Sequence, residues 1–364
     1  MKVTVVGAGV VGCSIAYELA ARGADVRLVD PRGSGQGATR ASAGMLAPQI
    51  EGHSEALRRL GLSSLELYDS FIARVAADAE CRIEYRRTGT LQVARNDTEA
   101  RELEVDSGVL AGIGVECSYL QGAAVRRLEP SLAADLCAGL LIPQHGYVGV
   151  ATLISALTEA AARVGARLTA SDVRSVAALS GSVETKTSAE TIVSDAVVLA
   201  AGSWSGGIPM GSAAPAPVRP VRGQLLQLRF DRPPLSRVVW GCGGYAVPWE
   251  DGRLLVGATV EDVGFDEGVT THGVQQLLDC ARALLPDAGS AKCDGARAGL
   301  RPKTPDELPI VGASSAMPGV YYATGHYRNG VLLSPLTSVM IADLLLEGRE
   351  HEALALTRPD RFGL

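Results

Sequence analysis

The fold of this chain is set near its amino terminus by the sequence Gly7-Ala8-Gly9-Val10-Val11-Gly12. The β-branched residues 3–6 before it predict a buried strand, and the residues after it, up to Arg22, have the apolar spacing of a helix. Residues 26–29 predict a second strand, which ends at Asp30. Strand, glycine-rich turn, helix and strand together predict the βαβ unit of a dinucleotide-binding fold.

The residues of this unit suit particular parts of a dinucleotide. Gly7 permits the tight turn, Gly9 lets the backbone approach a pyrophosphate, and Gly12 lets the helix pack against the strand. The helix amino terminus offers N–H donors and a positive dipole end to the phosphates. Asp30, 18 residues after Gly12, can accept hydrogen bonds from the adenosine ribose and would repel a 2′-phosphate. Such a unit serves both NAD and FAD, so it leaves that choice open.

Length and composition exclude several classes of protein. The 364 residues are enough for two or three domains, and 47% hydrophobic with 20% charged residues indicates an ordered globular chain. A net charge of -6 gives no general attraction to nucleic acid or to an anionic membrane, so neither is expected as a partner. The longest apolar stretch, residues 331–346, is interrupted by Ser334, Pro335 and Asp343, and we expect no transmembrane helix.

The seven cysteines are odd in number, scattered and never spaced as CxxC. They predict free thiols in a reducing cytoplasm rather than a disulfide framework, and no metal site is expected. Residues 2–21 superficially resemble a secretory signal, but the regular glycines and the acidic end of the second strand argue against export. We therefore expect a cytoplasmic protein.

Three later segments favour FAD over NAD. Residues 35–45 are small, polar and glycine-rich, so they can pass close to an extended ligand, although a flexible surface loop has the same composition. Residues 195–204 predict a buried strand that ends in small residues. Residues 319–330 predict a strand, a glycine-rich turn and then an apolar helix. The amino terminus of that helix could stabilise negative charge on a reduced flavin.

At this point the chain resembles the FAD-dependent D-amino-acid oxidase superfamily and, within it, the bacterial glycine oxidases of thiamine biosynthesis. The resemblance covers essentially the whole length. It is carried by segments that occur in order: residues 7–12, 43–48, 195–204, 221–224, 245–248, 257–259, 299–302 and 325–330. One departure is Trp249, where the relatives usually carry a basic residue, and this puts the shape and charge of the site entrance in question.

The resemblance implies an α/β fold with a Rossmann-like FAD-binding domain and a discontinuous α+β substrate domain built on an antiparallel sheet. The FAD-binding domain would comprise residues 1–84, 146–214 and 296–364, and the substrate domain residues 85–145 and 215–295. Alternating patterns in residues 224–230, 245–248 and 253–257 agree with an antiparallel sheet. Residues 57–77 predict a long helix with one stripe that faces the core, formed by Leu57, Leu60, Ser64, Leu67 and Phe71.

An amino-acid substrate has a carboxylate that a guanidinium can hold with two parallel hydrogen bonds. Arg301 is the first candidate, and the family pattern gives it this role. The resemblance adds Tyr245 as a second donor to the carboxylate and Arg328 at the substrate edge near the flavin. Surface pairing of Arg301, sheet packing of Tyr245 and a loop contact of Arg328 are the structural alternatives.

The cofactor-binding residues that the motifs and the resemblance imply lie at the glycine-rich turns, the ribose acid and the two helix starts. They are Gly7, Gly9, Val10, Val11, Gly12, Asp30, Pro31, Ala38, Thr39, Ala43, Gly44, Met45, Val173, Gly202, His326, Tyr327, Arg328, Asn329, Gly330, Val331 and Leu332.

The reaction implied is hydride transfer from the substrate Cα to flavin N5, followed by reoxidation with molecular oxygen to hydrogen peroxide. No side-chain base need touch carbon, so His326 is expected to contact the flavin rather than act as a base. Some related sarcosine oxidases attach flavin through a cysteine where this chain has Ala298 and Leu300, so noncovalent FAD is expected. The resemblance also implies a homotetramer. A dehydrogenase with a quinone or protein acceptor, and a noncatalytic FAD-binding assembly subunit, remain alternatives.

Overall fold

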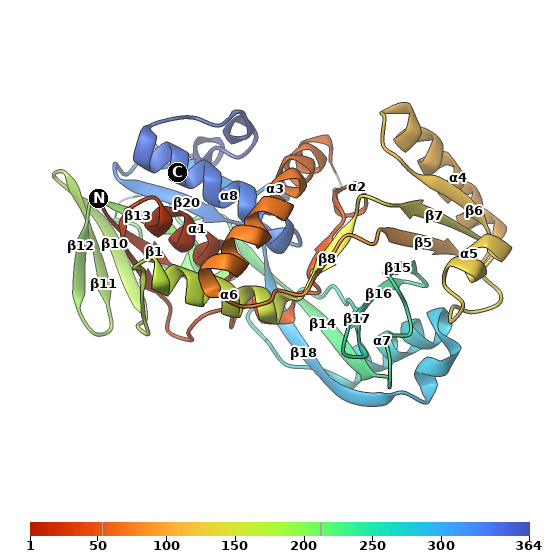
Figure 1. Ribbon diagram of the computed structural model, residues 1–364. Coiled ribbons are helices and arrows are strands. Elements are labelled where there is room, and N and C mark those ends of the chain that lie inside the picture. The colour runs from red at the N-terminus through yellow and green to blue at the C-terminus, as the bar shows by residue number, and fades with distance from the viewer. Residues whose placement is uncertain (53, 212) are drawn as a thin grey trace.

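The amino-terminal βαβ unit lies at the centre of a six-stranded sheet in the computed structural model, which describes residues 1–52, 54–211 and 213–364 (Figure 1). In spatial order the strands are β19 (Ile310–Ala313), β20 (Val320–Thr324), β13 (Ala196–Leu199), β1 (Lys2–Val6), β2 (Asp25–Val29) and β9 (Arg167–Thr169). All neighbours are parallel except β19, which runs antiparallel to β20 at the edge. The predicted βαβ unit is confirmed.

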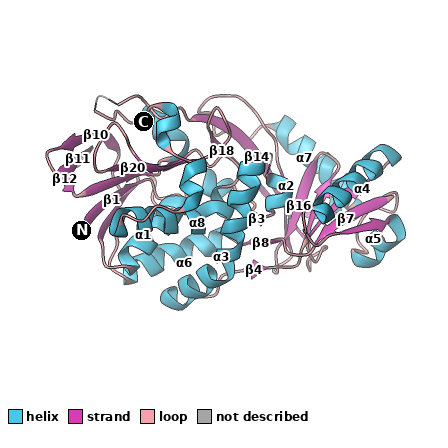
Figure 2. Ribbon diagram, turned by 90° about the horizontal axis from the view of Figure 1, so that it is seen from above, coloured by secondary structure: helices cyan, strands magenta, loops and turns pink. Residues whose placement is uncertain are grey.

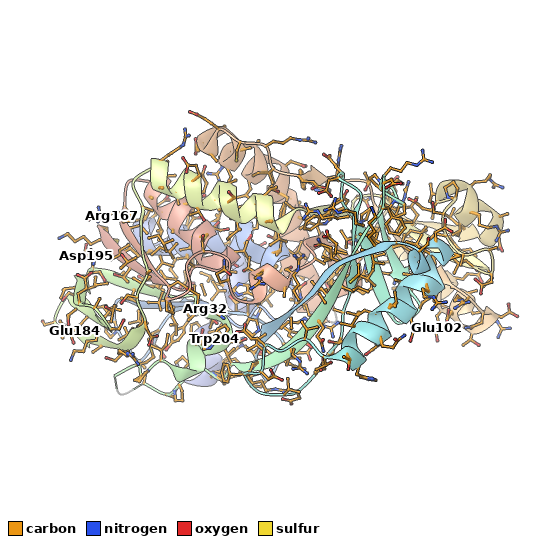
Figure 3. All side chains as sticks on the ribbon, turned by 90° about the horizontal axis from the view of Figure 1, so that it is seen from below. Arg32, Glu102, Arg167, Glu184, Asp195 and Trp204 are labelled. Carbon is orange, nitrogen blue, oxygen red and sulfur yellow. The ribbon has the colours of Figure 1, made fainter. Side chains whose placement is uncertain are left out.

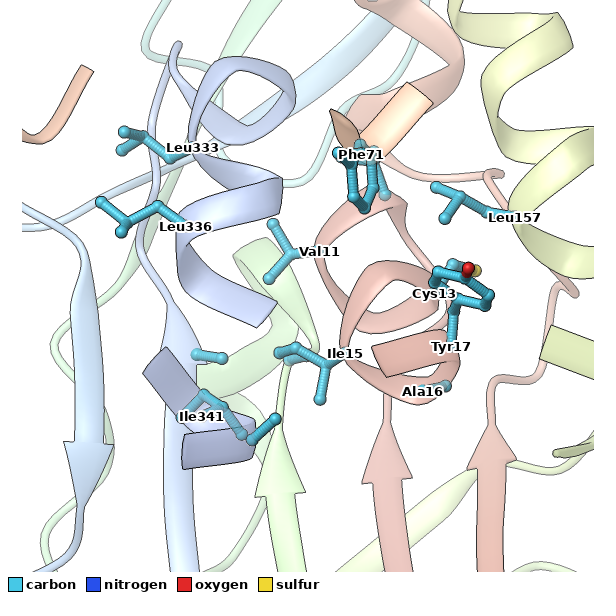
Figure 4. Close-up of a cluster of buried hydrophobic side chains, with 14 of the residues drawn as sticks. Val11, Cys13, Ile15, Ala16, Tyr17, Phe71, Leu157, Leu333, Leu336 and Ile341 are labelled. Carbon is cyan, nitrogen blue, oxygen red and sulfur yellow. The ribbon is translucent and has the colours of Figure 1, made fainter. Parts of the chain in front are cut away.

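Helices cover one face of this sheet. They are α1 (Val10–Ala21), α3 (Glu55–Ala79), α6 (Val150–Arg163) and α8 (Gly330–Ala342), and Figure 2 shows them packed side by side. Helix α1 is buried along nearly its whole length: Val11 and Ile15 face α8, whereas Cys13 and Tyr17 lie on the side of Leu157 in α6 (Figure 4). The turn that precedes α1 is therefore held by the largest apolar cluster of the chain.

The other face of the sheet is covered by a small antiparallel sheet of β10 (Val173–Leu179), β11 (Ser182–Thr187) and β12 (Thr191–Ser194). Val6, Val197 and Leu199 of the central strands pack there against Val176 and Val183. Because both faces are covered, the buried positions of the central strands β1, β2 and β13 are almost all apolar, with Thr4 as the exception.

Helix α3 begins at Ser54, whose hydroxyl accepts a hydrogen bond from Leu57 N at 3.2 Å. It is slightly longer than predicted. The predicted stripe is wrong at Leu67, which is only half-buried, while Tyr68 is fully buried. At 3.6 residues per turn, a step of four residues from Ser64 stays closer to the stripe than a step of three.

The helical segment 330–347, formed by α8 and the π-turn η4 (Asp343–Glu347), is long and apolar enough to span a membrane by length and composition alone. However, 72% of it is buried inside the protein. Its apolar character is explained by its position against α1 and α3 in the core.

A second, eight-stranded sheet forms the other lobe in Figure 1. In spatial order its strands are β18 (Lys292–Lys303), β14 (Arg219–Arg229), β17 (Arg253–Gly257), β16 (Gly244–Pro248), β15 (Val238–Gly241), β5 (Thr90–Ala94), β7 (Ala138–Ile142) and β6 (Ser118–Gln121). All neighbours are antiparallel except the pair β15 and β5. The predicted α/β fold with an antiparallel second sheet is confirmed.

Helices and short elements complete this lobe and join it to the first. The helices are α2 (Pro48–Glu51), α4 (Asp97–Gly112), α5 (Gly122–Leu128) and α7 (Thr271–Leu284). A three-stranded sheet at the junction contains β3 (Met45–Leu46), β8 (Gly146–Val148) and β4 (Tyr85–Arg86). The short helical turns are η1 (Ala38–Ala41), η2 (Gly202–Gly207), η3 (Pro286–Gly289), η5 (Glu352–Leu356) and η6 (Pro359–Phe362). Strand β18 runs across the predicted boundary at 295/296, and the domain boundaries stay a prediction.

Proline inside α8 creates a local need for hydrogen-bond donors. Pro335 has no N–H, so it cannot bond the carbonyl of Val331 one turn earlier. Tyr68 of α3 donates its hydroxyl to that carbonyl at 2.5 Å, and Ser64 donates to the next one, that of Leu332, at 2.6 Å. Helix α3 therefore fixes the first turn of α8.

Replacing Tyr68 with Phe should lower the free energy of unfolding by about 1 kcal/mol, because the buried carbonyl of Val331 loses the shorter of its two side-chain hydrogen bonds and keeps only that from Ser334 Oγ at 3.0 Å. The measurement is urea unfolding of the holoenzyme. The matched control is Tyr85→Phe, whose hydroxyl donates to the exposed Asp69 at 2.7 Å and can be replaced by water. Equal effects of the two changes would contradict this account of α8.

Candidate active site

Two positions at the turn between β1 and α1, Gly7 and Gly12, have room for glycine only. Gly7 has a φ of +104°, and a Cβ there would meet the carbonyl oxygen of Ala200 at 2.4 Å. A Cβ on Gly12 would meet the carbonyl oxygen of Gly7 at 1.9 Å. These contacts hold the start of the helix directly against the ends of β1 and β13.

The amino terminus of α1 is free to bind an anion. Its N-cap is Gly9, which has no side chain to cap it, and the first turn contains no acidic residue. Val10 N donates to Thr39 Oγ1 at 2.9 Å, while α-helical geometry leaves the N–H groups of Val11 and Gly12 without an intrahelical partner. Donors and dipole together form a phosphate site.

Asp30 lies beside this turn at the end of β2. Its carboxylate accepts hydrogen bonds from Ala8 N at 2.9 Å and Arg32 N at 2.8 Å. These two bonds fix the orientation of the carboxylate, which lines the same cavity as the glycine turn. It therefore presents acceptor oxygens where the sequence predicts the ribose.

A cavity of about 790 Å³ runs from this turn to the second sheet. Most of the predicted cofactor residues line it: Gly7, Gly9, Val10, Val11, Asp30, Ala38, Thr39, Ala43, Gly44, Met45, Gly202, His326, Tyr327, Arg328, Asn329, Gly330 and Val331. Residues 37–45 line it too, apart from Arg40, so this segment is a cavity wall rather than a flexible surface loop. Four predicted residues lie outside the lining: Gly12, Pro31, Val173 and Leu332. Their roles stay predictions.

A second helix amino terminus opens into the cavity at α8. Asn329, at its N-cap, makes no capping bond with its side chain, and its buried Nδ2 has no partner among the described residues. The dipole of α8 therefore places positive potential on this wall, where negative charge on a ligand would be stabilised.

His326 precedes this helix and is buried. Its Nε2 lies 3.0 Å from Thr337 Oγ1, and burial lowers the pKa of the imidazole to about 3. The ring is therefore neutral at physiological pH and engaged with its own helix. Both observations argue against a general base, and the expected contact of His326 with the flavin stays a prediction.

Two arginines on neighbouring strands, the buried Arg222 and the half-buried Arg301, differ in their partners. Arg222 of β14 pairs with Glu261 at 2.6 Å and Asp266 at 2.5 Å. Arg301 of β18 donates from one terminal nitrogen to two carbonyl oxygens, of Arg222 at 3.2 Å and Thr259 at 3.0 Å, and pairs with no carboxylate among the described residues. Burial lowers the pKa of Arg301 from its ordinary value. A buried cation without a counter-ion is costly, so this site is built for an anion from outside the chain.

The position of Arg301 depends on glycine at 223. Gly223 lies on β14 opposite Gly299, and a Cβ on it would come within 2.1 Å of the Arg301 guanidinium. The side chain of Arg301 thus lies over the backbone of Gly223, where no side chain intervenes. Its remaining N–H donors are directed to the cavity that Arg301 lines.

Tyr245 and Arg328 line the same cavity as Arg301. Burial raises the pKa of the Tyr245 phenol above its ordinary value, so it is a neutral hydrogen-bond donor. Its ring contacts that of Trp240, with centroids 4.9 Å apart. Arg328 has a buried Nε without a partner among the described residues. The structure brings the three predicted residues together, and their individual roles stay predictions.

Sequence reasoning missed several residues that line the cavity. At the ribose end, the guanidinium of Arg32 lies over the ring of Trp204 at 4.2 Å (Figure 3). At the other end, Trp240 and Glu51 line it as well. Glu51 follows the Met45 motif closely, and an acid so near a cofactor motif was the one available signal.

The departure at Trp249 left the shape and charge of the site entrance in question. This side chain is buried beneath the wall that contains Tyr245, with Arg253 over its ring at 4.4 Å, and it does not line the cavity. Apolar packing against β16 and β17 keeps it from any entrance. All seven cysteines are free, and the described residues contain no cluster of histidine, cysteine and acidic side chains that could hold a metal.

These observations fit FAD. Two open helix amino termini, a fixed carboxylate at the end of β2 and the unpartnered Asn329 Nδ2 all face one elongated cavity. The first helix suits a pyrophosphate and Asp30 a ribose, while α8 suits the pyrimidine side of a flavin. The unpaired Arg301 lies at the flavin end, where a small anion would meet the ring.

Comparison with known proteins agrees with this geometry. Residues 2–344 match the family described as DAO, FAD dependent oxidoreductase. The glycine oxidase of Geobacillus kaustophilus is 36% identical over 94% of this chain and 92% of that protein, and that of Pseudomonas aeruginosa is 32% identical over 96% and 95%. The crystal structure of the Geobacillus enzyme superposes with a TM-score of 0.92 at 34% identity, covering 98% of both chains. The crystal structure of an iminodiacetate oxidase from Chelativorans superposes with a TM-score of 0.89 at 27% identity, covering 98% of both chains.

The fold and the site define an FAD-dependent amino-acid oxidase. The chain belongs to the DAO family of FAD dependent oxidoreductases. The expected resemblance to glycine oxidases and the expected FAD cofactor are confirmed.

Replacing Gly223 with Ala should displace the Arg301 guanidinium and raise KM for the amino-acid substrate about tenfold or more, since a shift of about 1 Å disrupts a fixed hydrogen-bonding fork. FAD content should not change, because position 223 does not line the cavity. Steady-state kinetics and the flavin-to-protein absorbance ratio measure the two effects. Gly108→Ala, on α4 with open space around it, is the matched control. An unchanged KM would show that Arg301 does not need this space.

Proposed function

We propose that the protein oxidises glycine and other small amino acids, including sarcosine and small D-amino acids, to the imine, with molecular oxygen as acceptor. The observation that carries this proposal is the half-buried guanidinium of Arg301 at the flavin end of the cavity, which pairs with no carboxylate among the described residues. The glycine oxidases among the relatives support it. The iminodiacetate oxidase supports a secondary amine such as sarcosine as a further substrate.

The chain's own residues would bind and orient the substrate. Arg301 holds the carboxylate, with Tyr245 as a second donor from the neighbouring wall. Arg328 adds positive charge on the side of α8, next to its dipole. The buried walls exclude water and keep the Cα–H bond in one orientation. When bound, FAD supplies the acceptor for the Cα hydrogen, which leaves as hydride to N5. The imine then hydrolyses to glyoxylate and ammonia, and oxygen is reduced to hydrogen peroxide.

The test is a panel of small amino acids assayed for hydrogen peroxide, with Arg301→Ala as the variant. The kcat/KM for glycine should fall about 100-fold or more, equivalent to about 3 kcal/mol, because the substrate carboxylate loses a desolvated charge partner. Arg229→Ala, on the exposed part of β14, is the control. Full activity of Arg301→Ala would overturn the proposal.

The same panel separates the alternatives. Flavin that is bleached by substrate without oxygen and returns only slowly in air would indicate a dehydrogenase. Tight FAD binding without bleaching by any amino acid would indicate a noncatalytic subunit.

We also propose that FAD is held without a covalent bond. The positions on β18 where related sarcosine oxidases carry the attaching cysteine are occupied by Ala298 and Leu300, while Cys293 is exposed at the start of that strand and does not line the cavity. Heating the protein in acid should release all the yellow flavin into the supernatant, measured by its absorbance. Colour that remains in the precipitate would contradict this.

A role in thiamine biosynthesis, with the imine supplied to thiazole formation, is part of the proposal. It is supported by similarity to a bifunctional ThiO/ThiG protein of Nostoc, 35% identical over 97% of this chain and 54% of that protein. We propose a cytoplasmic location on the cysteine pattern and the argument against export, and a homotetramer on the resemblance alone.

A further inference from the structure

Glu51 is a buried acid that the reaction described above does not use. It is the last residue of α2, its side chain is 7% exposed, and it lines the cavity. Its Oε2 has no hydrogen-bond partner among the described residues. Buried glutamates are almost always paired, so an unpartnered one on a cavity wall requires an explanation.

The charges around Glu51 come from several elements. Arg301 of β18 and Arg328 of the turn before α8 both interact with its carboxylate electrostatically, as does Tyr245 of β16. On α3, which packs on α2, the nearest cation is Arg58 beside Gly52, and Arg58 is paired with Glu55 at 3.1 Å. The carboxylate of Glu51 therefore shares its cavity with two arginines but forms no ion pair with either.

Burial raises the pKa of the Glu51 carboxyl, and the two arginines only partly oppose this effect. A carboxylate in this state is a stronger base than one in water. The other candidates near Arg301 are poorer bases, because His326 has a pKa lowered to about 3 and Tyr245 is held as the neutral phenol.

The other acids on the cavity wall lie elsewhere or are engaged. Asp30 is at the ribose end, and Glu99 accepts a hydrogen bond from Arg95 N at 2.8 Å on α4. Glu102 also lies on α4, and neither it nor Glu99 is among the charged groups that act on Arg301, whereas Glu51 is. Glu51 is thus the acid that shares the Arg301 end of the cavity.

An amino acid in neutral water carries an ammonium as well as a carboxylate. Hydride can leave Cα only when the nitrogen has a free electron pair to form the C=N bond, so one ammonium proton must be lost first. A cavity with an unpaired guanidinium and an unpaired carboxylate matches both charges of such a zwitterion.

We propose that Glu51 binds the substrate ammonium and accepts one of its protons before the Cα–H bond breaks. In this step the N–H bond breaks, its electron pair stays on nitrogen, and an O–H bond forms on the Glu51 carboxylate. The total charge is unchanged, and the proton passes to solvent after the product leaves. The inference rests on the proposed function and names how the same site activates its substrate.

The test is the pH dependence of kcat/KM for glycine in the holoenzyme of Glu51→Gln. At neutral pH the variant should lose about 10- to 100-fold in kcat/KM, the range typical of a general base. The value should then rise about tenfold per pH unit towards the pKa of the substrate amine, since only substrate that is already neutral can react. The unaltered enzyme should show a much flatter profile over the same range.

Glu55→Gln, an exposed acid four residues away on α3, is the matched control and should keep the unaltered profile. FAD content and thermal midpoint of each variant are measured alongside. A uniform loss of activity without a change in the pH profile indicates a structural role and overturns the proposal. So does an unaltered profile in Glu51→Gln.

Two further measurements keep the test decisive. If Glu51→Gln does not retain FAD, Glu51→Asp takes its place. It should be slower but keep the flat profile, and a steep profile there would overturn the proposal. Second, acetate, which has no amine, should inhibit the unaltered enzyme more weakly as pH rises through the pKa of Glu51. Absence of that dependence also overturns it. If the unaltered enzyme oxidises no small amino acid, the proposed function itself has failed.

Discussion

The architecture of the site depends on one half-buried cation, Arg301, that has no counter-ion among the described residues. Arg301 is held by the carbonyl oxygens of Arg222 and Thr259, so its position is fixed while its charge remains uncompensated. The neighbouring Arg222, by contrast, is neutralised by Glu261 and Asp266. Removing a guanidinium from water without a partner is costly, and folding must supply that free energy from the packing of both sheets. The result is a site whose unpaired guanidinium can bind the carboxylate of a small ligand.

The two sheets contribute different parts of the site around Arg301. The parallel sheet and its helices place two helix amino termini on one cavity, and each is anchored by apolar packing that leaves no freedom to shift. The antiparallel sheet contributes Arg301 and Tyr245 on strands whose neighbours, Gly223 and Gly257, leave space for them. Positive potential from both sides then surrounds the cavity. The carboxylate of the buried Glu51 is the negative group there that interacts electrostatically with Arg301 and Arg328.

Local sequence was enough to predict the parts with strong short-range signals. The turn at Gly7 to Gly12 is predictable because steric contact with Ala200 and with its own backbone excludes any side chain. The strands and long helices follow from apolar periodicity, although Tyr68 takes the buried place predicted for Leu67. The position of Trp249 was not predictable from the sequence. Its sequence context is that of an active-site strand, but which side of the wall a residue faces depends on the packing of β16 against β17.

The sequence by itself determined the dinucleotide fold, the class of cofactor and, through family motifs, the arginine and tyrosine that meet a carboxylate. These are encoded in contiguous residues whose spacing is fixed by backbone geometry. Only the tertiary structure decided that Arg301 forms no ion pair with an acid among the described residues while Arg222 forms two, and that Glu51 lines the same cavity as Arg301. Partners in these cases are separated by long stretches of chain, so whether a charge is paired is set by how the sheets pack and not by neighbours in sequence.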